Sequence, residues 1–173
     1  MPRDPALAAK WLRKAADQGD VWSEYNLGLQ YFDGEGVSRD YAMAAELYKK
    51  AGDQGNAMAQ YSLGVMYTQG LGVDQNYATA ATWYRKSADR GLANAQYNLA
   101  TQYARGEGVP RNPVQAYKWL SLVVLNSEAS EVRDRAAEER RGIAGQMTKA
   151  QITEAEKQVK SFMPLPGGDE NSQ

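Results

Sequence analysis

Residues 57–92 read AMAQYSLGVMYTQGLGVDQNYATAATWYRKSADRGL, and the pattern of this stretch returns at an offset of 36 residues on either side. Tyr61, Leu63 and Tyr67 each have an identical residue 36 positions earlier and 36 positions later. A fixed period of this length is typical of solenoids, in which each repeat buries its apolar face by stacking on its neighbours. The repeat therefore predicts an extended surface and favours a binding function over catalysis in a pocket.

Within this stretch the spacing of apolar residues predicts two helices joined by a glycine loop. Small and apolar side chains recur at helical spacing over residues 57–69. Gly70-Leu71-Gly72-Val73 then interrupts the pattern, because glycine adopts backbone angles that other residues oppose. A second helix is expected over about 77–88, with Gly91 just beyond its end. The expected fold is all-α, a right-handed α-solenoid of antiparallel helix pairs.

The start of each second helix carries a signal of its own. Residues suited to cap a helix N-terminus occupy one column of the repeat, namely Asp4, Asp40, Asn76 and Asn112. Pro5 and Pro113 directly follow two of them, where a helix tolerates proline best. These signals place the second helices independently of the apolar pattern.

Several of these columns together resemble the Sel1-like repeat family, a relative of the tetratricopeptide repeat with a longer loop between its helices. The matching motifs are Ala59-Gln60-Tyr61-Ser62-Leu63-Gly64, Tyr67, Gly70-Leu71-Gly72-Val73, Tyr77, Ala80-Ala81 and Trp83-Tyr84. The resemblance implies an adaptor or scaffold that assembles protein complexes, with many bacterial examples. It also implies a weak preference for a periplasmic or secreted location.

Composition excludes several kinds of chemistry. The 173 residues include no Cys and no His, so thiol nucleophiles, Ser-His triads and ordinary zinc sites are ruled out. The formal net charge of −1 gives no general attraction to nucleic acid or anionic membrane. The longest apolar run, residues 122–125, is too short to cross a bilayer. We therefore expect no cofactor, no metal, no nucleic acid and no membrane insertion.

The columns also predict how the chain is divided. The expected parts are the second half of a repeat at 1–20, complete repeats at 21–56, 57–92 and 93–128, capping helices at 129–163 and a disordered tail at 164–173. Thr148 to Gln151 has the pattern of a capping box that opens the last helix. For the first helix two hypotheses stand: the chain is a fragment of a longer protein, which we favour, or this helix is a natural N-terminal cap.

Some positions of the first helix carry different residues in different repeats, and they lie on the side of the helix opposite the positions that stay the same. These varied positions predict the binding face. In helical-pair solenoids the first helix lines the concave surface, so these residues are the candidate partner-binding site. The varied residues are Trp22, Leu29, Gln30 and Asp33, then Met58, Val65, Met66 and Gln69, then Asn94, Thr101, Gln102 and Arg105, with Asn26, Ser62 and Asn98 between the two sides. Their mixture of apolar and amide side chains suits a peptide or protein helix. The alternative is that Trp22, Met58 and Met66 are core residues.

Three functions compete on this sequence. The first is a non-enzymatic adaptor that holds a protein or peptide on its concave face. The second is a cell-wall-related enzyme or β-lactam-binding protein, as the resemblance to cysteine-rich relatives implies, although the sequence lacks both S-x-x-K and K-T-G. The third is a structural module that is monomeric or associates weakly end to end through the helix that carries Trp11.

Overall fold

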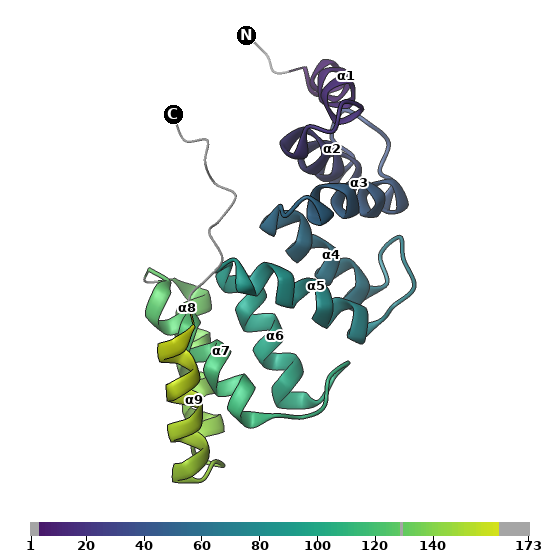
Figure 1. Ribbon diagram of the computed structural model, residues 1–173. Helices are drawn as coiled ribbons and strands as arrows, with labels where there is room; N and C mark the ends of the chain where they lie inside the picture. Colours follow the sequence, from purple (N-terminus) through teal and green to yellow (C-terminus); the bar gives the residue numbers. More distant parts are fainter. Residues whose placement is uncertain (1–3, 129, 163–173) are drawn as a thin grey trace. The chain divides into compact units, whose positions relative to one another are not determined.

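The computed structural model describes residues 4–128 and 130–162, and within them it contains only helices (Figure 1). In chain order they are α1 (Pro5–Ala16), α2 (Val21–Asp33), α3 (Tyr41–Asp53), α4 (Ala57–Gln69), α5 (Tyr77–Asp89), α6 (Ala93–Arg105), α7 (Pro113–Asn126), α8 (Glu131–Ala144) and α9 (Lys149–Ser161). The all-α helical repeat fold is therefore confirmed. The chain divides into two compact units, Met1–Asn76 and Tyr77–Gln173, called unit 1 and unit 2 below.

In unit 1 each helix packs against the next one along the chain, from α1 to α4 (Figure 1). Asp4, Asp40 and Asn112 form the caps predicted for their helices. Asp4 accepts hydrogen bonds from the backbone N–H groups of Ala6 and Leu7, and Asp40 accepts one from Met43. In unit 2 Asn112 caps α7 in the same way. Each cap satisfies N–H groups that have no partner inside the helix.

The two glycines of each loop perform different tasks. Gly70 ends α4 in the left-handed conformation, with φ of 70°. Gly72 also has a positive φ, and it lies against the first turn of α3, so close that an added Cβ would be 2.3 Å from the carbonyl carbon of Tyr41. Gly36 approaches Pro5 of α1 in the same way, and in unit 2 Gly108 approaches Tyr77 of α5. The second glycine therefore sets how closely successive repeats stack.

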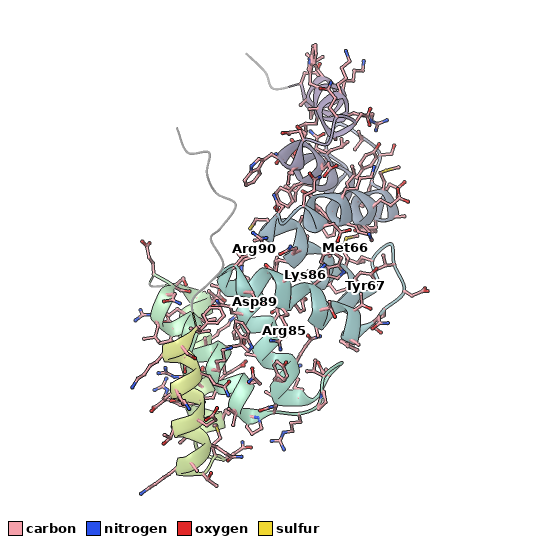
Figure 2. The ribbon with its side chains drawn as sticks, viewed as in Figure 1. Met66, Tyr67, Arg85, Lys86, Asp89 and Arg90 are labelled. Atoms are coloured by element: carbon pink, nitrogen blue, oxygen red, sulfur yellow. The ribbon has the colours of Figure 1, made fainter. Side chains whose placement is uncertain are left out.

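A tyrosine column joins neighbouring repeats by hydrogen bonds. Arg13 on α1 donates to the hydroxyl of Tyr31 on α2. In unit 2 Arg85 on α5, which is labelled in Figure 2, donates to the hydroxyl of Tyr103 on α6. Both arginines also lie over the ring of the tyrosine that they contact. The same contact occurs at the same place in both units, so packing between repeats explains why tyrosine recurs at this position.

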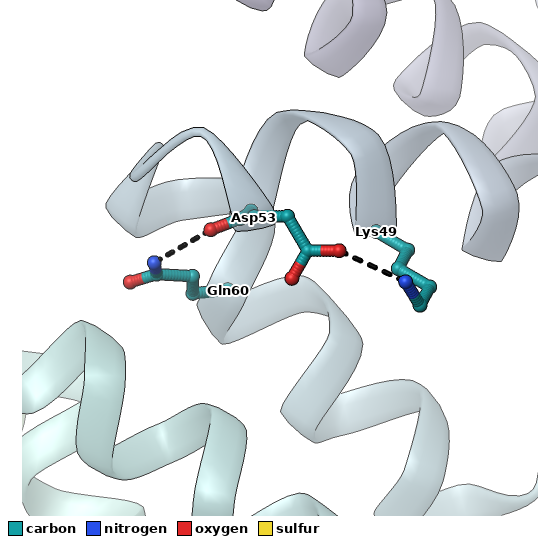
Figure 3. A network of polar contacts seen from close by, with 4 residues as sticks. Lys49, Asp53 and Gln60 are labelled. Carbon is teal, nitrogen blue, oxygen red and sulfur yellow. Dashed lines mark hydrogen bonds and ion pairs between the residues drawn. The ribbon is translucent and has the colours of Figure 1, made fainter.

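A buried amide performs a similar task at the C-terminal ends of the second helices α3 and α5. Gln60 on α4 donates to the carbonyl of Gly52 at 2.8 Å, beside the Lys49–Asp53 ion pair of 2.9 Å (Figure 3). In unit 2 Gln96 donates to the carbonyl of Ala88 in the same register. These bonds satisfy carbonyl groups at the C-terminal ends of α3 and α5.

Glu24 of α2 stands at the position that Gln60 and Gln96 occupy in the next two repeats. Its carboxylate has no proton to donate when it is ionised. Its side chain is buried and accepts a hydrogen bond of 2.8 Å from Gln54. Burial raises the pKa of the Glu24 carboxyl above its usual 4.5, and the charge of Lys50 opposes this shift only in part. The ionised carboxylate therefore opposes folding at neutral pH.

We expect Glu24→Gln to stabilise the protein by about 1 kcal/mol at pH 7, because the amide can still accept from Gln54 and can also donate to the carbonyl of Ala16. A group whose pKa is raised by folding favours the folded state below its unfolded pKa, and this contribution is lost as pH rises through the folded pKa. The advantage of the variant should therefore shrink between pH 7 and pH 4. Urea unfolding at pH 7 and pH 4 measures the difference in free energy of unfolding between the variant and the original protein. An equal difference at both pH values would contradict the conclusion that the ionised Glu24 carboxylate opposes folding.

Unit 2 begins with the pair α5 and α6 and ends with three helices that pack together, since α7 contacts both α8 and α9 (Figure 1). The predicted capping box is confirmed, because Thr148 and Gln151 bond reciprocally at the start of α9. The first of the helices expected within 129–163 begins at Glu131. The tail predicted at 164–173 lies outside the described residues.

Candidate functional site

The candidate site in unit 1 is the side of α2 and α4 that carries the varied columns. Trp22 and Met58 occupy equivalent positions in the first turn of each helix, and each is 41% exposed. Leu29 and Val65 lie two turns further along and are half-buried, as are Asn26 and Ser62 between them. We call these six residues the α2–α4 face.

Tyr48 of α3 supports this face from beneath. Its ring lies 5.7 Å from the ring of Tyr25 on α2 and packs against Gly28 of the same helix, and its hydroxyl lies near the side chain of Ser62 on α4. Burial raises the pKa of the Tyr48 hydroxyl, so this group stays protonated and neutral beneath the face. One buried side chain therefore lies against both helices of the face.

The exposed Trp22 is held in place by local contacts. Its ring packs edge-on against Tyr25, with centroids 6.4 Å apart and an angle of 80° between the planes. Its backbone carbonyl accepts a hydrogen bond of 2.8 Å from the side-chain amide of Asn26. A large aromatic side chain that is already ordered loses little conformational entropy when a partner covers it.

One predicted column does not belong to an accessible surface. Met66 is completely buried, Gln102 is buried, and Gln30 is half-buried. In unit 2 the amide of Gln102 donates to the carbonyl of Tyr77 at 3.2 Å, at the start of the second helix of the preceding repeat. The expectation that Met66 and Gln102 line the binding face is therefore corrected, whereas Gln30 is half-buried like Leu29.

The sequence held a signal for this correction. Met66 comes three residues after Leu63 and seven after Ala59, and both of those residues are buried. Positions i, i+4 and i+7 share one stripe of a helix, so Met66 continues the core stripe although its column varies between repeats. Variation shows a tolerance of substitution, which a core position can also have.

The equivalent side of α6 in unit 2 is more polar. Asn94 and Arg105 are exposed, while Asn98 and Thr101 are half-buried. In the same helix Tyr97 donates to a carboxylate oxygen of Glu139 on α8, and burial together with this bond raises the pKa of Tyr97 to about 12. The third repeat therefore presents the amide of Asn94 where α2 and α4 present Trp22 and Met58.

The outer ends of the three first helices complete the predicted set. Asp33 and Gln69 are exposed, like Arg105, and each directly precedes the glycine that ends its helix. The backbone carbonyl of Asp33 accepts a hydrogen bond from Arg39. These three side chains differ in charge from repeat to repeat and lie more than two turns from Trp22, Met58 and Asn94.

The part of the chain that the structure describes contains neither a membrane-spanning helix nor a cluster of metal ligands. None of its helices has the length and apolarity that crossing a membrane requires. Within the same residues, no three Asp, Glu, His or Cys side chains come together in the manner of a metal site.

Comparison with known proteins places these features in a wider group. Among solved structures, a protective antigen present in uropathogenic Escherichia coli strains and displaying an SLR fold is 28% identical, with a TM-score of 0.66. That match covers 90% of this chain and 40% of the antigen. A Sel1 repeat protein from Oxalobacter formigenes is 27% identical, with a TM-score of 0.71, over 88% of this chain and 70% of its own. This chain thus spans about two fifths of the E. coli protein's length. No curated protein matches significantly.

The family comparison agrees in phase with the helix pairs. The Sel1 repeat pattern matches residues 1–20, 23–56, 57–92 and 93–122, which together make up well over half of the sequence. Each of the three longer matches covers most or all of one first helix, its glycine loop, and most or all of the second helix that follows. This chain belongs to the Sel1 repeat family.

Proposed function

We propose that the protein is a non-enzymatic adaptor that binds a peptide or a protein segment on the α2–α4 face. Sel1 repeats generally serve as protein–protein interaction modules. The observation that carries the choice of face is the exposure of Trp22 and Met58 at equivalent positions of two helices that share one buried support, Tyr48.

The chemistry of the face indicates the kind of partner. An indole and a thioether provide apolar contact, and methionine adapts its shape to different partners. Asn26 and Ser62 lie beside them and can bond to polar groups of the partner. This combination suits an amphipathic helix or an extended segment with an apolar side chain every one or two turns. In unit 2 the exposed Asn94 and Arg105 would offer a separate, polar contact.

We expect the double substitution Trp22→Ser and Met58→Ser to weaken partner binding at least tenfold, because interface aromatic residues commonly carry the largest share of binding energy. The free energy of unfolding should change by less than about 1 kcal/mol, since both side chains are partly solvated already. The measurement is affinity capture from an extract of the source organism, followed by calorimetric titration of the captured protein.

Met43→Ser is the matched control for this experiment. Met43 lies on α3 and is 38% exposed, nearly as much as Met58, but it belongs to a second helix. Binding should survive this substitution. A partner that is lost equally with Met43→Ser, or that is retained by the Trp22 and Met58 variant, would contradict the proposed face.

A further inference from the structure

One acidic side chain continues the exposed side of α2. Positions i, i+4, i+7 and i+11 share one stripe of a helix, and in α2 they carry Trp22, Asn26, Leu29 and Asp33. The first three belong to the α2–α4 face, and Asp33 is exposed at the last residue of the helix. Burial is the main reason that the pKa of the Tyr48 hydroxyl is raised, and the Asp33 carboxylate lies close enough to add to this effect. The α2–α4 face therefore ends in a carboxylate.

The fold itself does not require an acidic residue at this position. A carboxylate in the last turn of a helix meets the negative end of the helix dipole, which disfavours it. Gln69 and Arg105 occupy the equivalent positions of α4 and α6 and avoid this conflict. In the part of the chain that the structure describes, no ion pair compensates Asp33, and the Arg39 guanidinium bonds to its backbone carbonyl instead. The carboxylate is thus available to a partner.

The charges of unit 1 are divided between its first and second helices. Neither α2 nor α4 contains a Lys or an Arg. The cations of residues 4–76 all lie on α1, on α3 or in the loop before α3, namely Lys10, Arg13, Lys14, Arg39, Lys49 and Lys50. The two helices that carry Trp22 and Met58 therefore present a negative charge and have no cation of their own to neutralise it.

From this arrangement we infer that the partner of the α2–α4 face is a basic protein segment, with an apolar anchor over Trp22 and Met58 and a Lys or Arg that pairs with Asp33. The inference rests on the proposed function, because it specifies the partner of the same face. Asp33 follows Trp22 by 11 residues, which is about 16 Å along the helix. A partner that runs along α2 spans this distance with about eleven residues of helix or about five of extended chain. The charge pair selects basic segments over acidic ones.

Selection from displayed peptides tests the inference without the natural partner. Random peptides long enough to reach from Trp22 to Asp33 are selected on the whole chain, and those that also bind the Trp22→Ser and Met58→Ser double variant are discarded. We expect the remaining peptides to contain apolar residues and more Lys and Arg than the unselected library. Selection on Asp33→Lys should instead enrich Asp and Glu, because the charge at the end of the face is reversed.

The contribution of Asp33 is then measured on one selected peptide by fluorescence anisotropy at low salt. Asp33→Asn should weaken binding at least about fivefold, since it removes the charge and keeps the shape of the side chain, and added salt should reduce this loss. Glu46→Gln is the matched control, because Glu46 is exposed on the second helix α3 and its replacement changes the net charge equally. Binding to this control should stay within about twofold of the original chain. Asp33→Asn should melt no lower than the original chain, since the carboxylate opposes the helix dipole.

The outcomes separate this inference from the proposed function. Peptides that depend on Trp22 and Met58 but carry no excess of Lys and Arg would overturn the inference and leave the proposed function in place. The same conclusion follows if the selected peptide binds Asp33→Asn as tightly as the original chain. Failure to select any peptide that depends on Trp22 and Met58 would contradict the proposed function, and the inference would fall with it.

Discussion

Replacing Gly72 with alanine is expected to destabilise the protein by about 4 kcal/mol or more, the largest effect that we predict for a single added methyl group. Gly72 has a φ of +66°, and its added Cβ would lie 2.3 Å from the carbonyl carbon and 2.5 Å from the carbonyl oxygen of Tyr41. These atoms are backbone of the first turn of α3, so no side-chain rotation relieves the overlap. The repeats must move apart or the loop must change its path.

Gly19→Ala is the matched control. Gly19 has a φ of +84°, but an added Cβ there would meet nothing within 4 Å. That substitution should cost only the strain of placing a residue with a Cβ in the left-handed conformation, about 1–2 kcal/mol. Urea unfolding followed by circular dichroism gives both free energies by linear extrapolation. Equal losses for the two variants would show that the close approach of Gly72 to α3 contributes nothing.

The second large effect is expected for Trp119→Ala, with a loss of about 3–5 kcal/mol. Trp119 is completely buried in α7. Its ring packs edge-on against Phe162 at the end of α9, 5.3 Å between centroids, and the Lys118 ammonium lies 4.4 Å from the ring centre. Removal of the indole therefore leaves a cavity between α7 and α9 and loosens the C-terminal helices from the last repeat.

Trp11→Ala provides the comparison, because Trp11 occupies the same column of the repeat but is 63% exposed. The cost there should stay below about 1 kcal/mol, since little buried surface is lost. Both variants can be measured by thermal unfolding, and limited proteolysis should cut α8 and α9 faster in Trp119→Ala. Equal costs at the two positions would mean that burial of Trp119 does not stabilise the cap.

The fold was predictable to a large extent because its signals are local and repeated. Asp40 caps α3 and Asn112 caps α7 from the column that the sequence predicted, and Thr148 and Gln151 form the predicted capping box. Capping and glycine conformation depend on a few neighbouring residues, so a sequence pattern suffices to place them. Because the pattern repeats, each local signal occurs in several repeats and supports the same prediction each time.

The candidate site was less predictable, as Met66 and Gln102 show. Both positions vary between repeats, as a binding surface does, yet both are buried. A varied column shows only that several side chains fit. Whether the position faces solvent depends on which helix packs over it, and that helix comes from another part of the chain.

The sequence by itself determined the helix pairs, their order, their caps and the glycine loops, because each depends on spacing and backbone preference within one repeat. Only the tertiary structure decided that Gly72 touches α3, that Trp11 and Trp119 differ completely in burial within one column, and that Tyr48 supports the α2–α4 face. The physical reason is that burial belongs to contacts between repeats. Identical positions gain or lose those contacts according to which helices lie beside them.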